Sequence, residues 1–328
     1  MTNFIIRRMM AMLITMLVLS LVSFIIIQLP PGDYLSAYIA KLRATGDTVS
    51  DDMIEALRVQ YGLDQPFYIQ YWKWISNIVL HGDFGRSFEW KQPVSELVWG
   101  RIGLSMMVEG MTVIFIWAIA VPVGIYSAVR RYSIGDHVGT VFCFIGVATP
   151  NFMLALILMY FAYLWSGTSI AGLFSDQYAN AEWSMARFMD FLKHAWAPVI
   201  VLGTAGTAQI MRVMRANLLD EINKPYVVTA RSKGLAEHQL ILKYPVRVAL
   251  NPLVSTLGWI LPTLVSGSVI VGVVMSLPTA GPMLLRSLTS QDMYLAGAFV
   301  LLLGVLTLIG TLISDLILAW LDPRIRLS

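Results

Sequence analysis

Long apolar runs alternate with polar stretches along the whole chain, and the apolar runs set the expected architecture. Six of them reach the roughly 18 residues that a helix needs to cross the hydrocarbon core of a bilayer. They cover residues 9–29, 102–129, 138–165, 196–214, 253–277 and 294–321. Because lipid offers the backbone no hydrogen-bond partners, such segments must form helices rather than open strands. The pattern therefore predicts an all-α membrane protein with six transmembrane helices.

Positive charge near the helix ends predicts on which side of the membrane each polar stretch lies. Lys and Arg concentrate on the cytoplasmic loops of membrane proteins. With the N-terminus inside, thirteen of the 23 Lys and Arg residues fall on the cytoplasmic face, among them Arg7, Arg8, Arg324 and Arg326. Both termini are therefore expected to be cytoplasmic. The net charge of +3 follows from this topology and gives no reason to expect a nucleic-acid partner.

The first apolar run is expected to stay in the membrane as an anchor. Its apolar core is too long for a signal peptide, and Pro30, Pro31 and Gly32 stand where a small-residue cleavage site would be. The chain then divides into an N-terminal transmembrane helix (1–29), an external, periplasmic helical insertion (30–101) and a five-helix core (102–328). A cytoplasmic loop at residues 215–250 belongs to this core.

The external insertion is too long for a simple connector. Asp52 with Glu55 predicts a helix start and Gly62 its end. A second helix is expected from about Pro66 to Gly82, with Phe67, Tyr71, Ile75 and Ile78 on its inner face. The turn that follows is the candidate for an external lip or gate, with Phe84 held against the mouth of a pore; its residues are Gly82, Asp83, Phe84, Gly85 and Ser87. Alternatively, the insertion merely caps the helix bundle.

The polar stretch at residues 212–252 predicts a braced cytoplasmic knob. It carries seven basic and three acidic residues between two apolar runs. Pro225 suits the first turn of a helix, and Gly234 suits the left-handed position just past a helix end, so a short helix is expected over residues 225–233. Helical spacing then predicts a second, amphipathic segment with Pro245 as a kink and a stripe of Leu240, Ile241, Tyr244 and Val248. Alternatively, this stretch is only a charged loop that its positive charge keeps cytoplasmic.

Three stretches of the chain resemble one family of membrane proteins. Residues 226–235, Tyr-Val-Val-Thr-Ala-Arg-Ser-Lys-Gly-Leu, resemble the cytoplasmic EAA loop of ABC importer membrane subunits, in the form found in dipeptide/oligopeptide-type permeases. The general loop begins Glu-Ala-Ala where this chain has Val228, Thr229 and Ala230, and its glycine corresponds to Gly234. Residues 81–88 and 321–326 match the same branch. The resemblance implies a type I ABC importer permease fold in a bacterial or archaeal cytoplasmic membrane.

The resemblance also implies an assembly and a task. Such a subunit forms the pore with a second, homologous permease, and two cytoplasmic ATPases bind the ATP and Mg. An external binding protein delivers the substrate: peptides in this branch, with oligosaccharides or opine-like solutes as the alternative. The ATPase-coupling residues would be Tyr226, Val227, Thr229, Ala230, Arg231, Lys233, Gly234 and Leu235. Of these, Tyr226, Val227 and Leu235 would be buried against the ATPase, while Arg231 and Lys233 would supply polar anchoring.

The sequence offers no chemistry of its own. No lysine follows a glycine, so the Gly-Lys of a phosphate-binding P-loop does not occur. The four histidines are scattered and the single cysteine is Cys143, so no catalytic residue, metal site or cofactor is expected in this chain. The competing class is an autonomous secondary transporter or channel. That class would have ionisable residues at mid-membrane, whereas Glu109 and Asp315 lie nearer the ends of their runs.

Overall fold

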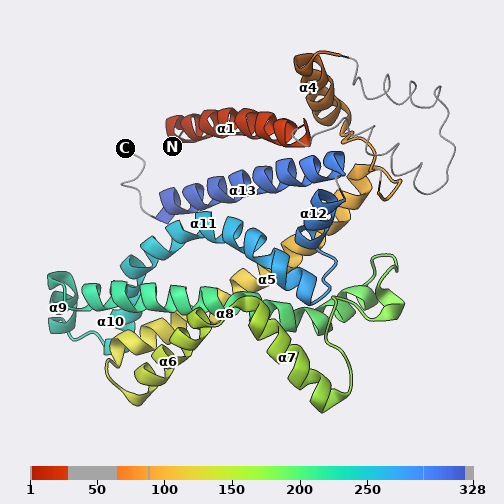
Figure 1. Cartoon of the computed structure of the whole chain (residues 1–328). Helices are drawn as coiled ribbons and strands as arrows, with labels where there is room; N and C mark the ends of the chain where they lie inside the picture. Colours follow the sequence, from red (N-terminus) through yellow and green to blue (C-terminus); the bar gives the residue numbers. More distant parts are fainter. Residues whose placement is uncertain (1, 29–64, 88, 291, 322–328) are drawn as a thin grey trace. The chain divides into compact units, whose positions relative to one another are not determined.

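The computed structural model describes residues 2–28, 65–87, 89–290 and 292–321, and within them the chain is helical (Figure 1). The principal helices are α1 (Thr2–Gln28), α4 (Phe67–Ser76), α5 (Val94–Val129), α6 (Ile134–Ala148), α7 (Asn151–Ser166), α8 (Met185–Ile222), α9 (Pro225–Ser232), α10 (Glu237–Lys243), α11 (Pro245–Val274), α12 (Ala280–Thr289) and α13 (Met293–Leu321). The expected all-α class is confirmed. The helix expected between Asp52 and Gly62 lies outside the described residues.

Two compact units make up the fold. The first holds Met1–Ile5, Leu104–Gly281 and Ile309–Ser328, and the second holds Ile6–Gly103 and Pro282–Leu308. Helix α8 is the centre of the first unit, where it contacts α6, α7 and α11 (Figure 1). Its start is capped by Ser184, whose side chain accepts a hydrogen bond from the backbone N–H of Arg187, an arrangement typical of helix N-termini. The knob helices α9 and α10 follow directly at its other end.

The third apolar run, expected as one span over residues 138–165, is two helices. Helices α6 and α7 meet at an angle of 104°. Thr149 at the junction is extended (φ −91°, ψ 119°), as favoured before a proline, and Pro150 then starts α7. Hydropathy does not reveal this break because apolar residues continue on both sides of it.

Four helices among the described residues are long and apolar enough to cross a membrane. These segments are Ile6–Ile26, Val94–Val129, Met185–Ile222 and Tyr294–Ile317, and the bent pair α6–α7 makes a fifth if it is one span. The multi-pass character expected from the sequence is therefore present. The number of six spans and the cytoplasmic position of both ends stay predictions.

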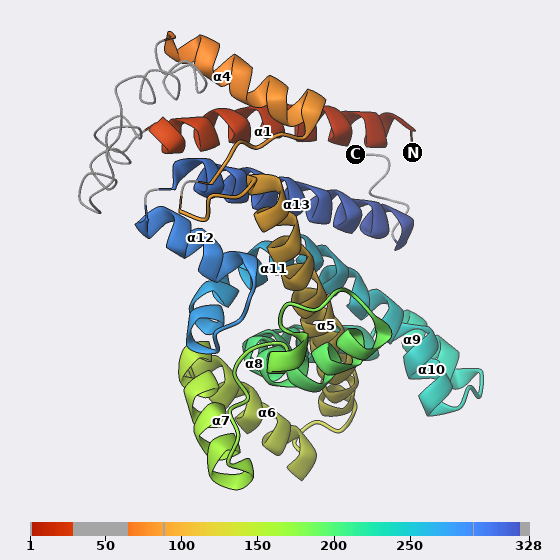
Figure 2. The ribbon, with the colours of Figure 1, turned by 90° about the vertical axis from the view of Figure 1, so that its right-hand side faces the viewer.

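The second unit contains the second helix expected in the external insertion. Helix α4 follows Pro66 and continues through a π-helical turn, Asn77–His81, to Gly82. It lies beside α1 (Figure 2). Phe24 of α1 forms an aromatic cluster with Tyr71 and Trp74 of α4. Tyr71, Ile75 and Ile78 pack on that cluster as expected. Phe67 differs, since half of its side chain is exposed, and the sequence analysis missed the buried Trp74.

Candidate coupling knob and external turn

Helix α9 has the bounds that its proline and glycine predict. Pro225 occupies the first turn after an extended Lys224 (φ −69°, ψ 151°). At the other end the backbone N–H of Gly234 donates to the carbonyl of Arg231 at 3.0 Å, with Gly234 at φ +80°. That left-handed conformation suits glycine because it has no Cβ. Pro245 was expected to kink the next segment, but it instead begins α11 after the separate short helix α10.

A buried carboxylate joins α8 to α9. Glu221, in the last turn of α8, is 8% exposed. It accepts a hydrogen bond from the Tyr226 hydroxyl at 2.6 Å and pairs with the ammonium of Lys224. Partial burial, reinforced by this hydrogen bond, raises the pKa of Tyr226, so its hydroxyl stays protonated and donates at any physiological pH. The sequence analysis missed Glu221; its only signal was an acidic residue a few positions before a lysine and a tyrosine.

An ion pair braces α9 against α10. The Arg231 guanidinium donates two hydrogen bonds to the Glu237 carboxylate, at 3.0 and 2.6 Å. The hydrogen bonds raise the pKa of Arg231 and lower that of Glu237. Both side chains are solvent-exposed, so the pair fixes the direction of the two helices more than it adds stability.

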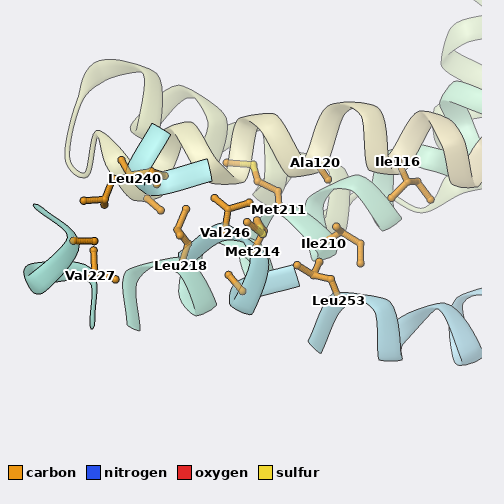
Figure 3. Close-up of a cluster of buried hydrophobic side chains, with 14 residues drawn as sticks. Ile116, Ala120, Ile210, Met211, Met214, Leu218, Val227, Leu240, Val246 and Leu253 are labelled. Carbon is orange, nitrogen blue, oxygen red and sulfur yellow. The ribbon is translucent and has the colours of Figure 1, made fainter. Parts of the chain in front are cut away.

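The inner face of the knob belongs to a continuous hydrophobic cluster of the first unit (Figure 3). Val227 and Leu240, from the two knob helices, are fully buried in it. The cluster continues through α8, α11 and α5, with Ile116, Ala120, Ile210, Met211, Met214, Leu218, Val246, Ala249 and Leu253. A displacement of α9 therefore meets closely packed side chains that lead into three long helices.

Helix contacts in the middle of this cluster are tight. A Cβ added to Gly124 of α5 would come within 2.8 Å of the Met214 Cβ and 3.0 Å of the Met211 carbonyl oxygen. Glycine thus permits the backbones of α5 and α8 to approach each other.

On another face of α8, Arg215 donates two hydrogen bonds of 2.9 Å to Asp136, which ties α6 to α8.

The outer face of α9 differs in part from the expected contact surface. Val227 and Ala230 are buried within the chain, and Leu235 packs against the same cluster, so these side chains do not face outward. Leu240 and Ile241 of α10 are likewise buried within the chain. Val248, expected on the inner stripe, is 42% exposed. The residues that α9 and its end expose are Pro225, Tyr226, Val228, Thr229, Arg231, Ser232, Lys233 and Gly234. Val228 was not among the expected coupling residues.

The external turn is compact and belongs to the second unit. Gly82 and Gly85 both have positive φ (+65° and +86°), and Asp83 accepts a hydrogen bond from the Gly85 N–H at 2.8 Å. Phe84 is 5% exposed, so its ring is buried in the protein. Its expected position against the mouth of a pore stays a prediction. Ser87 donates to the carboxylate of Asp292 at 2.5 Å.

Asp292 is the anchor of this turn, and the sequence analysis missed it. It is 1% exposed and also accepts hydrogen bonds from the backbone N–H groups of Glu89 and Leu295. One carboxylate therefore holds the turn and the start of α13 together across some two hundred residues of sequence. The bond to Leu295 is that of a helix N-cap, a role that its place before an apolar run could have suggested.

Within the described ranges, no group of three or more His, Cys, Asp or Glu side chains is placed to hold a metal ion. The polar clusters found are hydrogen-bonded joints between helices.

Comparison with known families decides the class of this protein. The family model for the inner membrane component of binding-protein-dependent transport systems matches residues 120–327, and the model for the N-terminal part of such components matches residues 1–108. The chain belongs to this family. This inner membrane component is a permease subunit, and the resemblance to dipeptide/oligopeptide-type importers is confirmed by its relatives.

The similar curated proteins are permeases along their whole length. The component is 34% identical to the oligopeptide transport system permease protein AppB of Bacillus subtilis, covering 99% of this chain and 100% of that one. It is 30% identical to the dipeptide permease DppB of Escherichia coli (99% of both chains) and 30% identical to the glutathione permease GsiC of Salmonella choleraesuis (99% of both chains).

A solved structure supports the fold. The inward-facing methionine ABC transporter MetNI has a chain that matches with a TM-score of 0.54 at 19% identity, covering 69% of this chain and 96% of that chain. At this identity the likeness concerns the fold, which is that of an ABC importer permease. An importer of this kind works with ATPase and substrate-binding partners.

Proposed function

We propose that this chain forms one half of the pore of an ATP-driven peptide importer. The relatives named for oligopeptides, dipeptides and glutathione support peptides as the substrate class, since each of these substrates contains peptide or peptide-like amide bonds. The other half of the pore is a homologous permease. Two cytoplasmic ATPases bind ATP and Mg, and an external binding protein delivers the peptide. In this proposal the chain crosses the cytoplasmic membrane of a bacterial cell six times, with both of its ends in the cytoplasm.

The knob formed by α9 and α10 converts closure of the ATPases into movement of the pore. The observation that carries this proposal is the buried cluster that runs without a break from Val227 and Leu240 to Ile116 in α5. Close-packed side chains change between discrete arrangements rather than deforming smoothly, so such a cluster passes a push on α9 to the long helices. The hydrogen bond of Glu221 to Tyr226 stiffens the start of α9, and the Arg231–Glu237 pair stiffens its end.

The exposed face of α9 is the proposed contact with an ATPase. Tyr226, Val228 and Thr229 offer a half-apolar surface, and Lys233 supplies charge at the helix end. Interfaces of this kind combine an apolar centre with a polar rim. The coupling residues proposed from the sequence thus divide into an outer set that touches the ATPase and an inner set, Val227, Ala230 and Leu235, that transmits the movement.

The proposal is tested by purifying the tagged chain from its native membrane in mild detergent. We expect a second permease, two ATPase chains and ATP hydrolysis in the eluate. The cells lacking this gene should fail to take up radiolabelled di- to pentapeptides, and the wild-type gene should restore uptake. A chain that purifies alone, without ATPase activity even after crosslinking, would establish an autonomous transporter instead.

The substrate class has a separate readout. The binding protein that copurifies with the complex is denatured, and its bound ligand is identified by mass spectrometry. A peptide supports the proposal. An oligosaccharide or an opine-like solute would leave the importer assembly standing and replace the substrate.

A further inference from the structure

Helix α4 and its π-helical turn present three distinct faces. The packed face holds Tyr71, Trp74, Ile75 and Ile78, which lie in the cluster around Phe24. The polar face holds Gln70, Lys73, Asn77 and His81, at helical spacing of three to four residues. Because one face already serves the fold, a second apolar face needs its own explanation.

That second apolar face is fully presented to the surroundings of the chain. Tyr68, Trp72, Val79 and Leu80 are each between 70% and 74% exposed. Tyr68 and Trp72 are one turn apart, and Val79 returns to the same side two turns later. The wider π-helical turn brings Leu80 near the same side. No acidic residue occurs between Phe67 and His81.

The depth of α4 follows from its partner. The apolar span of α1 runs from Ile6 to Ile26, and α4 contacts this span near its end rather than the polar chain beyond it. Ser20 and the Tyr71 hydroxyl are hydrogen-bonded at 2.8 Å, and the ring of Phe24 meets those of Phe67 and Tyr71 at 5.0 and 5.5 Å. At about 1.5 Å per residue, these contacts lie roughly 3–9 Å inside the end of the span. A helix packed there is at the level of the headgroups and upper acyl chains.

We propose that α4 and its π-helical turn lie in the membrane–water interface, with Tyr68, Trp72, Val79 and Leu80 against phospholipid. Helix α1 likewise exposes apolar side chains near the end of its span, among them Val22 and Ile25, and the composition of the α4 face fits the same surroundings. Tyr and Trp concentrate at the interface because their rings are apolar and their tips are polar. The polar face, with Lys73 as its single fixed charge, turns toward water and headgroups, while the apolar face meets the acyl chains.

This placement has a consequence for the external turn. The backbone N–H of Gly82 donates to the carbonyl of Ile78, and that of Asp83 to the carbonyl of Asn77, both at 3.1 Å. The turn at residues 82–87 therefore continues directly from the lipid-bound helix. Lipid holds α4 at a constant depth, and α4 holds the turn at a constant height above the membrane.

Depth-dependent quenching tests the proposal on the assembled transporter. The complex is reconstituted into vesicles of phosphatidylethanolamine and phosphatidylglycerol, in a Cys143→Ser background. A bimane label is attached at Trp72→Cys, at Val79→Cys and, as the matched control on the polar face, at Lys73→Cys. Variants that retain assembly with the partner subunits are then quenched either by lipids with a nitroxide at acyl carbon 5 or by aqueous iodide.

We expect the nitroxide lipid to quench labels at positions 72 and 79 at least about threefold more strongly than the label at 73, and iodide to give the reverse order. Equal, strong iodide quenching at all three positions would overturn the proposal, because α4 would then stand in water. Protection from both quenchers at 72 and 79 would also overturn it, since a protein surface would then cover this face. Leu80→Cys replaces Trp72→Cys if the latter fails to assemble.

Discussion

At the scale of single residues, the joint between α8 and α9 depends more on Tyr226 than on Lys224. Both donate to Glu221, but the Lys224 side chain is 49% exposed while that of Glu221 is 11% exposed. Water screens an exposed ion pair, so such pairs contribute only about 0–1 kcal/mol. A hydrogen bond to a charged, buried acceptor contributes about 1.5–3 kcal/mol. The hydroxyl of Tyr226 therefore dominates the joint.

Replacing Tyr226 by Phe should loosen the knob without removing its apolar surface. The change deletes the donor to Glu221 and leaves that carboxylate partly unsatisfied, a loss of about 1–3 kcal/mol at the joint. We expect more ATP hydrolysed per peptide imported, with unchanged amounts of the chain in the membrane. Tyr244→Phe is the matched control, because Tyr244 is a tyrosine of the same knob region and no hydrogen bond of its hydroxyl is found in the described part of the chain. An equal effect in both variants would contradict the role of Glu221.

The Arg231–Glu237 pair predicts a pH dependence with a definite sign. The pKa of Glu237 is lowered in the folded protein, mainly by its hydrogen bonds from Arg231. A lowered pKa contributes stability above the ordinary glutamate pKa of about 4.3, and the contribution is lost as the pH falls through the folded-state value. In melting curves of the purified complex, the difference in Tm between wild type and Glu237→Gln should be present at pH 6 and shrink steadily below pH of about 4. A difference that grows toward acid would show that the pair does not act in this way.

At the scale of elements, the sequence predicts what local chemistry decides. The bounds of α9 were predictable because Pro225 and Gly234 act on their own backbone. Pro245 was ambiguous, since a proline suits both a kink and a first helical turn, and packing of Leu240 and Val246 in the cluster decides for two helices. Glu221 and Asp292 could not be identified as joints, because their partners are chosen by the tertiary fold. The exposed side of α9 could not be predicted either, because it is the side that does not pack against the hydrophobic cluster.

The end of α9 can be tested by a substitution that acts only through the backbone. Nothing lies within 4 Å of a Cβ built on Gly234, so a larger side chain meets no steric obstacle there. A β-branched residue nevertheless disfavours φ +80° by about 1–2 kcal/mol, whereas asparagine tolerates that region. We expect Gly234→Val to leave the chain inserted but to uncouple ATP use from uptake, and Gly234→Asn to retain most of the coupling. Normal coupled uptake in the valine variant would argue against a rigid knob.

The external turn has its own element-scale prediction. Ser87→Ala removes the donor to the buried Asp292 carboxylate. This should destabilise the turn at residues 82–87 by about 1–3 kcal/mol. We expect weaker stimulation of ATP hydrolysis by the loaded binding protein, while the ATPases still copurify. Ser76→Ala, which removes only a hydrogen bond within the α4 helix, is the control. Loss of the ATPases from the Ser87→Ala complex would mean that the turn is needed for folding rather than for delivery.

At the scale of the whole molecule, we propose that the two faces of α9 have different tasks. The sequence places eight neighbouring residues in one motif, but a helix separates them by side. One side continues the hydrophobic cluster, and the other is open to a partner. A motif read as a contact surface is thus also a transmission surface. The first task requires proximity to an ATPase, and the second requires only close packing inside the chain.

Neighbouring valines on the two faces give a direct test in the assembled importer. Val227 is fully buried and Val228 is 48% exposed, so cysteines at the two positions differ in accessibility but hardly in sequence position. In a Cys143→Ser background, Val228→Cys should crosslink to an ATPase through a short bifunctional maleimide, and added ATP should change the yield. Val227→Cys should give no crosslink but should lower coupled uptake, because cysteine leaves part of the valine volume empty in the cluster. Crosslinking at position 227 with none at position 228 would show that Val227, and not Val228, faces the ATPase. Movement of the ATPases would then have to reach the long helices through residues other than Val227.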